Sequence, residues 1–166
     1  MATVLHAGCG YAELPGWLKG NDEVRLDVDP ECKPDIQASI TDLGEIGPYD
    51  IVLCQHALEH LYPHEVSTAL KEFHRVLIPG GYAAIFVPDL EEARPTEDVL
   101  FVSPAGPITG LDLFYGYRLA ISSGMKFMAH HTGFTQSTLA DALTIAGFKG
   151  VTYRLSNYNL LGIGIK

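Results

Sequence analysis

The sequence predicts an α/β fold in which helices cover both faces of a mostly parallel sheet. Short apolar runs typical of buried strands alternate along the chain with segments of helical periodicity, an alternation that produces parallel sheets. The chain ends in two strand-like runs, residues 150–155 and 158–165, separated only by Ser156 and Asn157. Such a short connection joins antiparallel neighbours. We therefore expect one antiparallel strand near the C-terminus.

Four strands are expected in the first third of the chain. Residues 2–6 form an apolar run that ends in a glycine-rich turn, and residues 23–27 form a second run that ends before Pro30. A weaker strand is expected near residues 35–38. Residues 49–54 read YDIVLC and are apolar enough for a strand buried on both faces. A helix is expected between the first two of these strands.

The clearest helical pattern follows the YDIVLC strand. Apolar residues recur there at steps of three and four and form one stripe: Val66, Ala69, Leu70, Phe73, Val76 and Leu77. Pro63 suits the first turn of this helix, and residues 79–81 (PGG) stop it. A buried strand is expected at residues 82–87, and a later helix at residues 139–146, which ends at Gly147.

Residues 90–134 differ from the rest of the chain. They contain three prolines, several glycines and a cluster of aromatic residues, and the segment is too long for a plain connection in a compact domain. We expect residues 1–166 to form a single domain in which residues of about 90–134 are an insertion or lid on the substrate side. A short helix is expected there near residues 111–122.

Composition excludes several classes of protein. The 166 residues are 47% apolar and 19% charged, which excludes a disordered chain. The net charge of −9 argues against binding to nucleic acid. No run of 18 apolar residues exists, so no membrane partner is expected, and the N-terminus lacks the basic start of a signal peptide. Three cysteines without CxxC spacing indicate free thiols and a cytoplasmic location.

A glycine turn and an acidic residue suggest a nucleoside cofactor. Gly8 and Gly10 follow the first strand and let the backbone approach a ligand closely, and Asp27 ends the second strand 19 residues after Gly8. An acid at that place can accept both hydroxyls of a ribose. NAD is disfavoured because Glu13 stands where a third glycine would support its pyrophosphate. S-adenosylmethionine has no phosphate, and its cationic end suits an acidic cleft.

Four segments carry a resemblance to a known family: VLHAGCG at 4–10, RLDVDP at 25–30, YDIVLCQHALEHL at 49–61 and LKEFHRVLIPGGYAAIFVPDL at 70–90. In this order and spacing they resemble the class I S-adenosylmethionine-dependent methyltransferases, in particular the small "type 11" group. The resemblance covers residues of about 2–90 and the helix before Phe148. It implies a three-layer α/β/α Rossmann-like methyltransferase fold with the strand order 3-2-1-4-5-7-6.

The resemblance also implies which residues hold the cofactor. The glycine loop would hold the methionine part, the acid the ribose, the loop after the third strand the adenine, and the residues after the fourth strand the methyl group. The matching residues are Ala7, Gly8, Cys9, Gly10, Asp27, Val28, Ser39, Ile40, Gln55 and His56.

The chain departs from the family pattern at three positions. The family often has an acidic residue where this chain has His6, and a third glycine where it has Ala12. It frequently has another acidic residue where this chain has Ser39. We expect these changes to affect cofactor affinity more than the fold. The given sequence begins almost at the first strand, without the helix that usually precedes it, so another segment or a second subunit, as in a homodimer, would cover the cofactor.

Residues 56–60 spell H-x-x-E-H, a pattern that binds zinc in inverted zinc peptidases. The pattern falls directly after a buried strand, where the methyltransferase family has its own LEH sequence. We therefore expect no metal there and expect Glu59 to pair with Arg75.

Other histidines and aromatic residues are candidates for catalysis and acceptor binding. A histidine with a pKa near neutrality can remove a proton from a hydroxyl acceptor, and the candidates are His56, His60 and His131. Asp89, Tyr115, Tyr117, Arg118 and His130 are the candidates for binding the acceptor.

The sequence thus predicts a methyltransferase that uses S-adenosylmethionine to methylate an oxygen or nitrogen atom of a small-molecule or sugar acceptor. The main alternative is a non-catalytic module that binds S-adenosylmethionine or S-adenosylhomocysteine, motivated by His6 and Ser39. An NAD-binding protein and an HxxEH zinc hydrolase are further alternatives.

Overall fold

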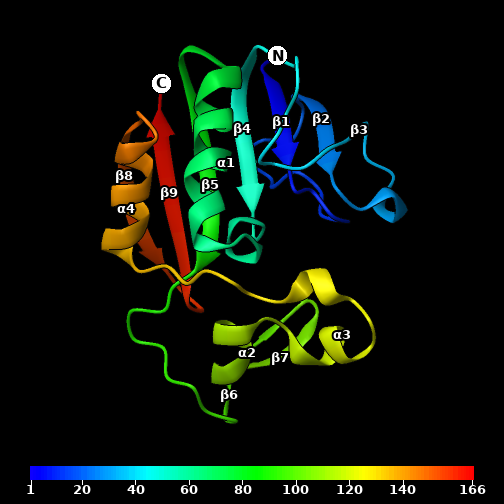
Figure 1. Cartoon of the computed structure of the whole chain (residues 1–166), viewed down its shortest axis with the longest axis vertical. Helices are drawn as coiled ribbons and strands as arrows, with labels where there is room; N and C mark the ends of the chain where they lie inside the picture. Colours follow the sequence, from blue (N-terminus) through cyan, green and yellow to red (C-terminus); the bar gives the residue numbers. More distant parts are fainter.

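The computed structural model describes all residues, 1–166, and is built on one sheet of seven strands (Figure 1). In chain order these strands are β1 (Thr3–Ala7), β2 (Asp22–Asp27), β3 (Ile36–Gln37), β4 (Tyr49–Gln55), β5 (Leu77–Pro88), β8 (Lys149–Leu155) and β9 (Asn159–Ile165). Their spatial order is β3-β2-β1-β4-β5-β9-β8. In this sheet β8 is the sixth strand along the chain and β9 the seventh, because β6 and β7 form a separate pair. The observed order is therefore the predicted order 3-2-1-4-5-7-6.

The first five strands of the sheet are parallel, and β9 is antiparallel to both of its neighbours, β5 and β8. A single antiparallel strand near the C-terminus was expected because only two residues separate the last two apolar runs. The predicted fold class is therefore confirmed. The carboxyl ends of β1, β2, β4 and β5 all lie at the lower edge of the sheet in Figure 1.

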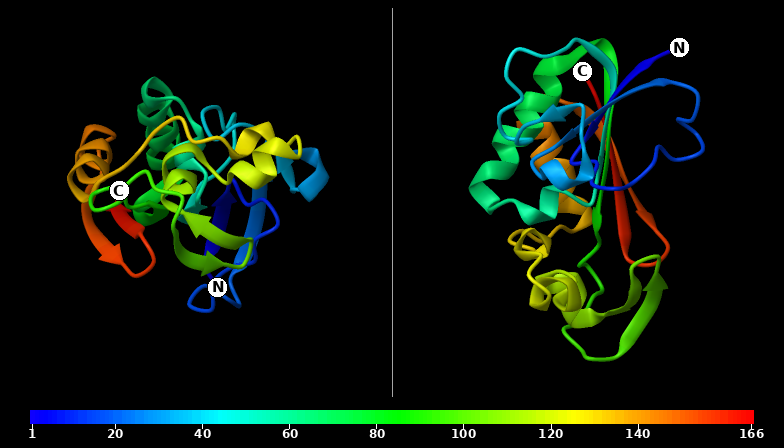
Figure 2. Two further views of the ribbon diagram at one scale, coloured as in Figure 1. Left: turned by 90° about the horizontal axis from the view of Figure 1, so that it is seen from below. Right: turned by 90° about the vertical axis from the view of Figure 1, so that its right-hand side faces the viewer.

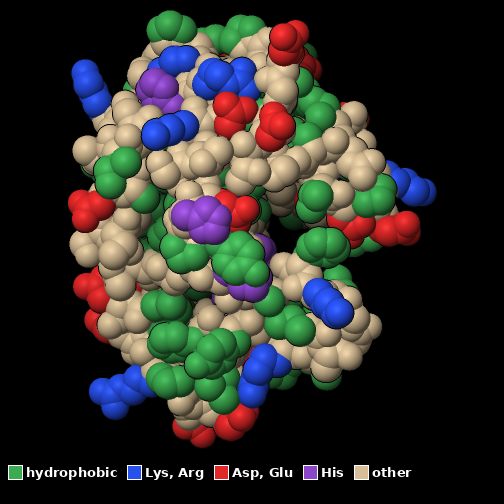
Figure 3. All heavy atoms as spheres, in the orientation of Figure 1, with side chains coloured by type: hydrophobic (Ala, Val, Ile, Leu, Met, Phe, Trp, Pro, Cys, Tyr) green, Lys and Arg blue, Asp and Glu red, His purple; other side chains and the backbone are tan.

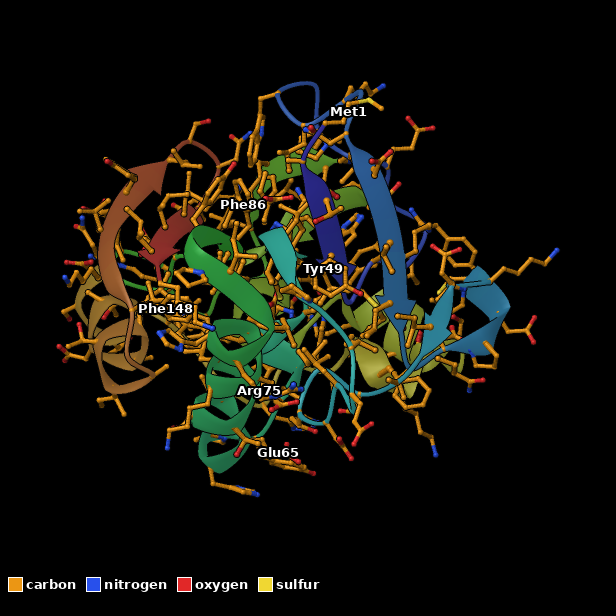
Figure 4. The ribbon with its side chains drawn as sticks, turned by 90° about the horizontal axis from the view of Figure 1, so that it is seen from above. Met1, Tyr49, Glu65, Arg75, Phe86 and Phe148 are labelled. Atoms are coloured by element: carbon orange, nitrogen blue, oxygen red, sulfur yellow. The ribbon has the colours of Figure 1, made fainter.

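Two helices, α1 (Pro63–Val76) and α4 (Gln136–Ile145), cover one face of the sheet (Figure 2). Pro63 starts α1, and the Glu65 carboxylate accepts a hydrogen bond from the Tyr62 backbone N–H at 2.9 Å. The apolar stripe of α1 is buried in a cluster of 24 residues that also contains Phe148 (Figure 4). No helix of the chain is both long and apolar enough to cross a membrane.

The opposite face carries an irregular segment in place of the helix expected between the first two strands. Residues 8–21 form consecutive turns that lie across this face (Figure 2, right). Pro15 and Gly16 favour turns over a long helix, and the Pro15 carbonyl accepts from the Leu18 N–H at 2.8 Å. Leu14 and Leu18 are nevertheless buried and complete a second, smaller cluster, against which Phe86 packs (Figure 4). The turns thus cover the part of this face formed by Val4, Ile51, Leu53 and Ala84, while side chains of β5 and β9 on the same face stay partly exposed.

Residues 89–134 connect β5 to α4 and lie beyond the carboxyl ends of the parallel strands (Figure 1). They form β6 (Val99–Ser103), β7 (Gly106–Thr109), α2 (Gly110–Tyr115), α3 (Arg118–Ser122) and the short 3-10 helix η3 (Lys126–Met128). Two further 3-10 helices, η1 (Pro30–Cys32) and η2 (Leu58–His60), follow β2 and β4.

The single helix predicted near residues 111–122 is instead two helices, α2 and α3. The chain breaks between them at Gly116, whose φ is +89°. A Cβ atom at this position would collide with the backbone carbonyl of Met128. The close approach of η3 therefore requires glycine and ends α2.

Candidate active site

The glycine loop and Asp27 lie together at the ends of two neighbouring strands. β1 and β2 are paired in parallel with Ala7 opposite Leu26, so the residues that follow each strand meet at the same edge. The Asp27 carboxylate accepts from the Gly10 N–H at 2.7 Å and from the Asp29 N–H at 2.9 Å. The structure thus brings together the glycine turn and the acid that the sequence singled out.

The two glycines of the loop are required for different reasons. Gly8 has a φ of +68°, and a Cβ atom there would lie 2.5 Å from the Cβ of Ala57. Gly10 has a φ of +48°, but no atom lies within 4 Å of the place where its Cβ would be. Gly8 therefore packs the loop tightly against the chain that follows β4, whereas Gly10 borders open space.

Arg25 and His6 support the loop from within the sheet. The Arg25 guanidinium donates to the carbonyls of Gly10 and Ala12, both at 2.7 Å. His6 is fully buried, and its Nδ1 lies 2.7 Å from a Glu23 oxygen. Burial lowers the pKa of His6 and outweighs the opposing effect of Glu23. His6 supports the loop only indirectly, through Glu23, which also accepts from the Arg25 guanidinium at 3.2 Å. The sequence did not signal these roles of His6 and Arg25.

Two free thiols flank Asp27. Cys9, Asp27 and Cys32 each offer one polar or sulfur atom within 4.8 Å of the others, and no disulfide is present. Burial raises the pKa of Cys9 to about 11, so the thiol stays protonated. The Cys32 thiol donates to the Asp29 carbonyl at 3.0 Å.

The remaining residues expected at the cofactor differ in exposure. Val28 is half exposed beside Asp27, and the Ser39 hydroxyl is hydrogen-bonded to Thr41 at 2.7 Å within a turn. The Ile40 side chain is buried in the large cluster, so only its backbone can border a ligand. Gln55 ends β4, and its side-chain oxygen is buried without a hydrogen-bond partner.

A cavity of about 480 Å³ lies between the ends of β4 and β5 and the segment that follows β5. Four of the predicted residues line it: His56, His60, Tyr117 and His130. The other lining residues include Glu59, Phe101, Leu113, Met128, Tyr158 and Asn159. In Figure 3, histidine side chains gather in the middle of this face, where the body of the sheet meets the lower segment.

Four predicted residues lie outside this cavity and have other partners. His131 stacks on Tyr62, with ring centroids 4.3 Å apart, and Tyr115 is 59% exposed. Asp89 is buried and accepts from Arg154 at 2.6 Å. Arg118 donates to Asp112 at 3.1 Å and to Glu97 at 2.7 Å. These two ionic groups stabilise the walls of the cavity and do not face it.

The acidic centre of the histidine cluster is Glu59, which is 1% exposed. One carboxylate oxygen, Oε1, lies 3.2 Å from the His56 Nδ1, and the other, Oε2, has no hydrogen-bond partner. Arg75 does not reach it and instead bonds Glu72 at 2.7 Å and the Gly44 carbonyl at 2.8 Å. The predicted pairing of Glu59 with Arg75 was therefore wrong.

The pKa values in the cluster follow from burial, from this hydrogen bond and from neighbouring charges. Burial is the largest single effect and disfavours the charged forms of both Glu59 and His56, but the hydrogen bond and the charge attractions together outweigh it, lowering the pKa of Glu59 and raising that of His56. Burial lowers the pKa of His130. His56 also has a φ of +50°, a conformation that costs energy for a non-glycine residue and recurs at functional sites.

The end of the segment after β5 is attached to η2 by its backbone. The N–H groups of His131 and Thr132 both donate to the Glu59 carbonyl, at 2.9 and 3.1 Å, and the Thr132 hydroxyl donates to the Leu61 carbonyl at 2.6 Å. This attachment brings His130 beside His60, with ring centroids 5.0 Å apart. No local pattern in the sequence signals a contact between residues that are 70 positions apart.

Comparison with known proteins shows which family part of the chain matches. A family model described as a methyltransferase domain matches residues 5–85. No curated protein sequence matches the chain. A solved structure of the Burkholderia thailandensis 1,6-didemethyltoxoflavin-N1-methyltransferase, with 1,6-didemethyltoxoflavin and S-adenosylhomocysteine bound, is similar over 99% of this chain and 71% of its own, with a TM-score of 0.64 and 19% identity.

Two further solved structures share the fold. An S-adenosylmethionine-dependent methyltransferase from Mesorhizobium loti has a TM-score of 0.67 and 17% identity over 99% of this chain and 91% of its own. An S-adenosylmethionine-dependent methyltransferase from Archaeoglobus fulgidus has a TM-score of 0.65 and 16% identity over 99% of this chain and 86% of its own. The matched residues 5–85 contain the glycine loop, Asp27 and the parallel strands that position them. Residues 5–85, about half of the chain, thus match the methyltransferase-domain family, and the whole chain has the fold of these S-adenosylmethionine-dependent methyltransferases.

Proposed function

We propose that the chain transfers a methyl group from S-adenosylmethionine to an oxygen or nitrogen atom of a small-molecule or sugar acceptor. The observation that carries this proposal is the contact between Gly8 and Ala57. Ala57 directly follows His56, which lines the 480 Å³ cavity. The glycine loop and the cavity therefore adjoin, as the donor and acceptor of a direct transfer must.

The residues at the ends of β1 and β2 fit the cofactor. The space beside Gly10 is open, and the Asp27 carboxylate has acceptor capacity beyond its two backbone hydrogen bonds, because each oxygen carries two lone pairs. When bound, S-adenosylmethionine supplies a methyl group on a positively charged sulfur that leaves as a neutral thioether. Asp27 would hold the ribose, the backbone of residues 7–10 the methionine part, and Val28 with the loop at residues 39–40 the adenine.

The cavity suits a small acceptor with both apolar and polar parts. Phe101 and Tyr158 stack on one side, with ring centroids 6.3 Å apart, and His56, Glu59 and His60 form the polar side. A volume of about 480 Å³ is in the range of small-molecule sites. The Burkholderia protein, which binds 1,6-didemethyltoxoflavin, supports an acceptor of this size.

His56 is the residue that we place as the base for a hydroxyl acceptor. Its backbone N–H donates to the Phe86 carbonyl at 2.9 Å, and its Nδ1 is held by Glu59, so the ring is fixed at the cavity wall. In the reaction the acceptor oxygen forms a bond to the methyl carbon, the carbon–sulfur bond breaks, and the hydroxyl proton passes to His56. Fixing the acceptor in line with methyl and sulfur supplies several kcal/mol of the rate acceleration.

We also propose that the 90–134 segment is an acceptor-side insertion of a single domain, since it contributes Phe101, Tyr117 and His130 to the cavity. The three free cysteines favour a reducing compartment, the cytoplasm.

The experiment uses S-adenosylmethionine with an isotope-labelled methyl group and a cell extract separated into small molecules and macromolecules. We expect label in the small-molecule fraction with the natural protein and none with Asp27→Ala. Label in macromolecules would contradict the acceptor class. Binding of S-adenosylhomocysteine by calorimetry without transfer to either fraction would favour the non-catalytic module.

A further inference from the structure

We propose that Glu59, His60 and His130 form a binding site for a divalent transition-metal cation, such as Zn²⁺, in the wall of the acceptor cavity. Each of the three side chains offers one ligand atom, and these atoms lie within 4.8 Å of one another. This trio is not the H-x-x-E-H pattern of the sequence, because His130 comes from the segment after β5 and His56 is not part of it.

The unpartnered oxygen of Glu59 is the first observation that points to a ligand. The residue is 1% exposed, and Oε2 lies inside the structure with no hydrogen-bond donor. A buried carboxylate oxygen without a partner is costly, and a bound cation removes that cost.

The second observation is the orientation of the two imidazoles. His60 Nδ1 lies 3.0 Å from the Ala129 carbonyl, and His130 Nδ1 lies 2.9 Å from the Leu113 carbonyl. A carbonyl only accepts, so each Nδ1 donates to it, and Nε2 is the ring nitrogen left to bind a metal. Histidines that bind metals in proteins are fixed in this same way, by a hydrogen bond from the other ring nitrogen.

The donor set selects the class of ion. One carboxylate oxygen with two imidazole nitrogens is a set found around catalytic zinc and around non-haem iron(II), each with open positions for other ligands. Magnesium and calcium prefer oxygen ligands. All three residues line the 480 Å³ cavity, so an ion that they hold would border the space proposed for the acceptor.

The other cluster of potential ligands, Cys9, Asp27 and Cys32, does not share these features. Both Asp27 oxygens accept backbone hydrogen bonds, and a pKa of about 11 keeps the Cys9 thiol protonated. A metal needs the thiolate.

The consequence for chemistry rests on the proposed methyl transfer. A cation at this place would bind an acceptor oxygen and lower the pKa of an acceptor hydroxyl, so that its proton leaves more readily. The site therefore favours an oxygen acceptor over an amine. His60 would act as a ligand and His56 would remain the proton acceptor.

The test is a titration of the metal-stripped full chain with Co²⁺ and with Zn²⁺, without S-adenosylmethionine. We expect one ion per chain and visible Co²⁺ absorption bands. His60→Ala and His130→Ala should each weaken binding at least about 100-fold, since each removes a ligand. His64→Ala and His131→Ala, which remove neighbouring histidines outside the trio, should bind as the natural protein does. Circular dichroism checks that all four variants are folded.

Two results would overturn the proposal: no binding by the natural protein, or equal affinity in the His130→Ala variant. Loss of binding in His56→Ala but not in His130→Ala would assign the metal to the H-x-x-E-H pattern instead. Glu59→Gln keeps the volume of the side chain, and it should weaken binding as the histidine variants do. Calorimetry of S-adenosylhomocysteine with the metal-stripped chain tests the cofactor site separately, so the two proposals can fail independently.

Discussion

The two ends of the candidate active site are built in different ways. The proposed cofactor end lies mostly within residues 6–29, with the loop at residues 39–40 beside it, and depends on backbone groups, two glycines and one carboxylate at the ends of paired strands. The acceptor end joins η2, the 90–134 segment and the turn before β9, and it depends on side chains. The first follows from the register of the sheet, whereas the second exists only when separate segments dock onto one another.

The largest effect is expected at the contact that joins the two ends. Gly8→Ala should lower the free energy of unfolding by about 3 kcal/mol, because it combines an unfavourable positive φ with a collision with Ala57. Gly44→Ala is the matched control: its φ of +61° is similar, but nothing lies within 4 Å of the added Cβ, so about 1 kcal/mol is expected. Urea unfolding measures both, and equal losses would show that the Ala57 contact is unimportant.

Next in size is the loss of the ribose contact. Asp27→Ala should weaken S-adenosylhomocysteine binding by about 100-fold, since charge-assisted hydrogen bonds are worth about 1.5–3 kcal/mol. Glu31 is an acidic residue of the same loop whose side chain makes no hydrogen bond. The Glu31→Ala variant should therefore bind S-adenosylhomocysteine as the natural protein does. Isothermal titration calorimetry decides, and unchanged affinity in Asp27→Ala would remove this residue from the cofactor site.

A smaller effect, confined to the acceptor end, is expected for Asp112. Its carboxylate accepts from the Thr109 hydroxyl at 2.6 Å and from Arg118 at 3.1 Å. Burial raises its pKa, but these bonds outweigh burial and hold the pKa below the ordinary value of 3.8. Asp112→Asn should therefore cost about 1–2 kcal/mol of stability near neutral pH. This stability is complete above about pH 5 and is lost as the pH falls through the lowered pKa.

Urea unfolding at pH 7 and pH 3 checks this sign, because the difference between the natural protein and Asp112→Asn should shrink at pH 3. Glu97→Ala is the control, since it removes an exposed partner of the same Arg118 and should leave the Tm unchanged within error. Cofactor affinity should be retained in both variants. If the stability difference between the natural protein and Asp112→Asn grew as the pH fell, the lowered pKa of Asp112 would be contradicted.

The same contrast explains how much the sequence could predict. The meeting of the glycine turn with Asp27 could be predicted because a strand, a glycine turn and an acid follow each other in a short stretch, and the role of these residues at the cofactor stays a prediction. The sheet order came from the family resemblance. The missing helix between β1 and β2 was not predicted, although Pro15 and Gly16 favour turns, because turns can bury Leu14 and Leu18 as a helix would.

At the acceptor end, the sequence named four of the residues that line the cavity but not the partners of their side chains. His56, His60 and His130 were singled out, but nothing local joins Glu59 to His130 or separates His130 from His131. The spacing of three residues between Glu72 and Arg75 on α1 was a usable signal, because side chains at this spacing meet on a helix. Because Arg75 pairs with Glu72 in this way, it is unavailable to Glu59.

The 90–134 segment leaves and rejoins the sheet body at one place. Asp89 and Phe134 form a parallel bridge, and the Leu90 N–H donates to the Phe134 carbonyl at 2.9 Å. Everything between these two residues can therefore be exchanged as a cassette without cutting a strand of the sheet. A chain with a different segment here would keep the glycine loop, Asp27 and every strand of the seven-stranded sheet.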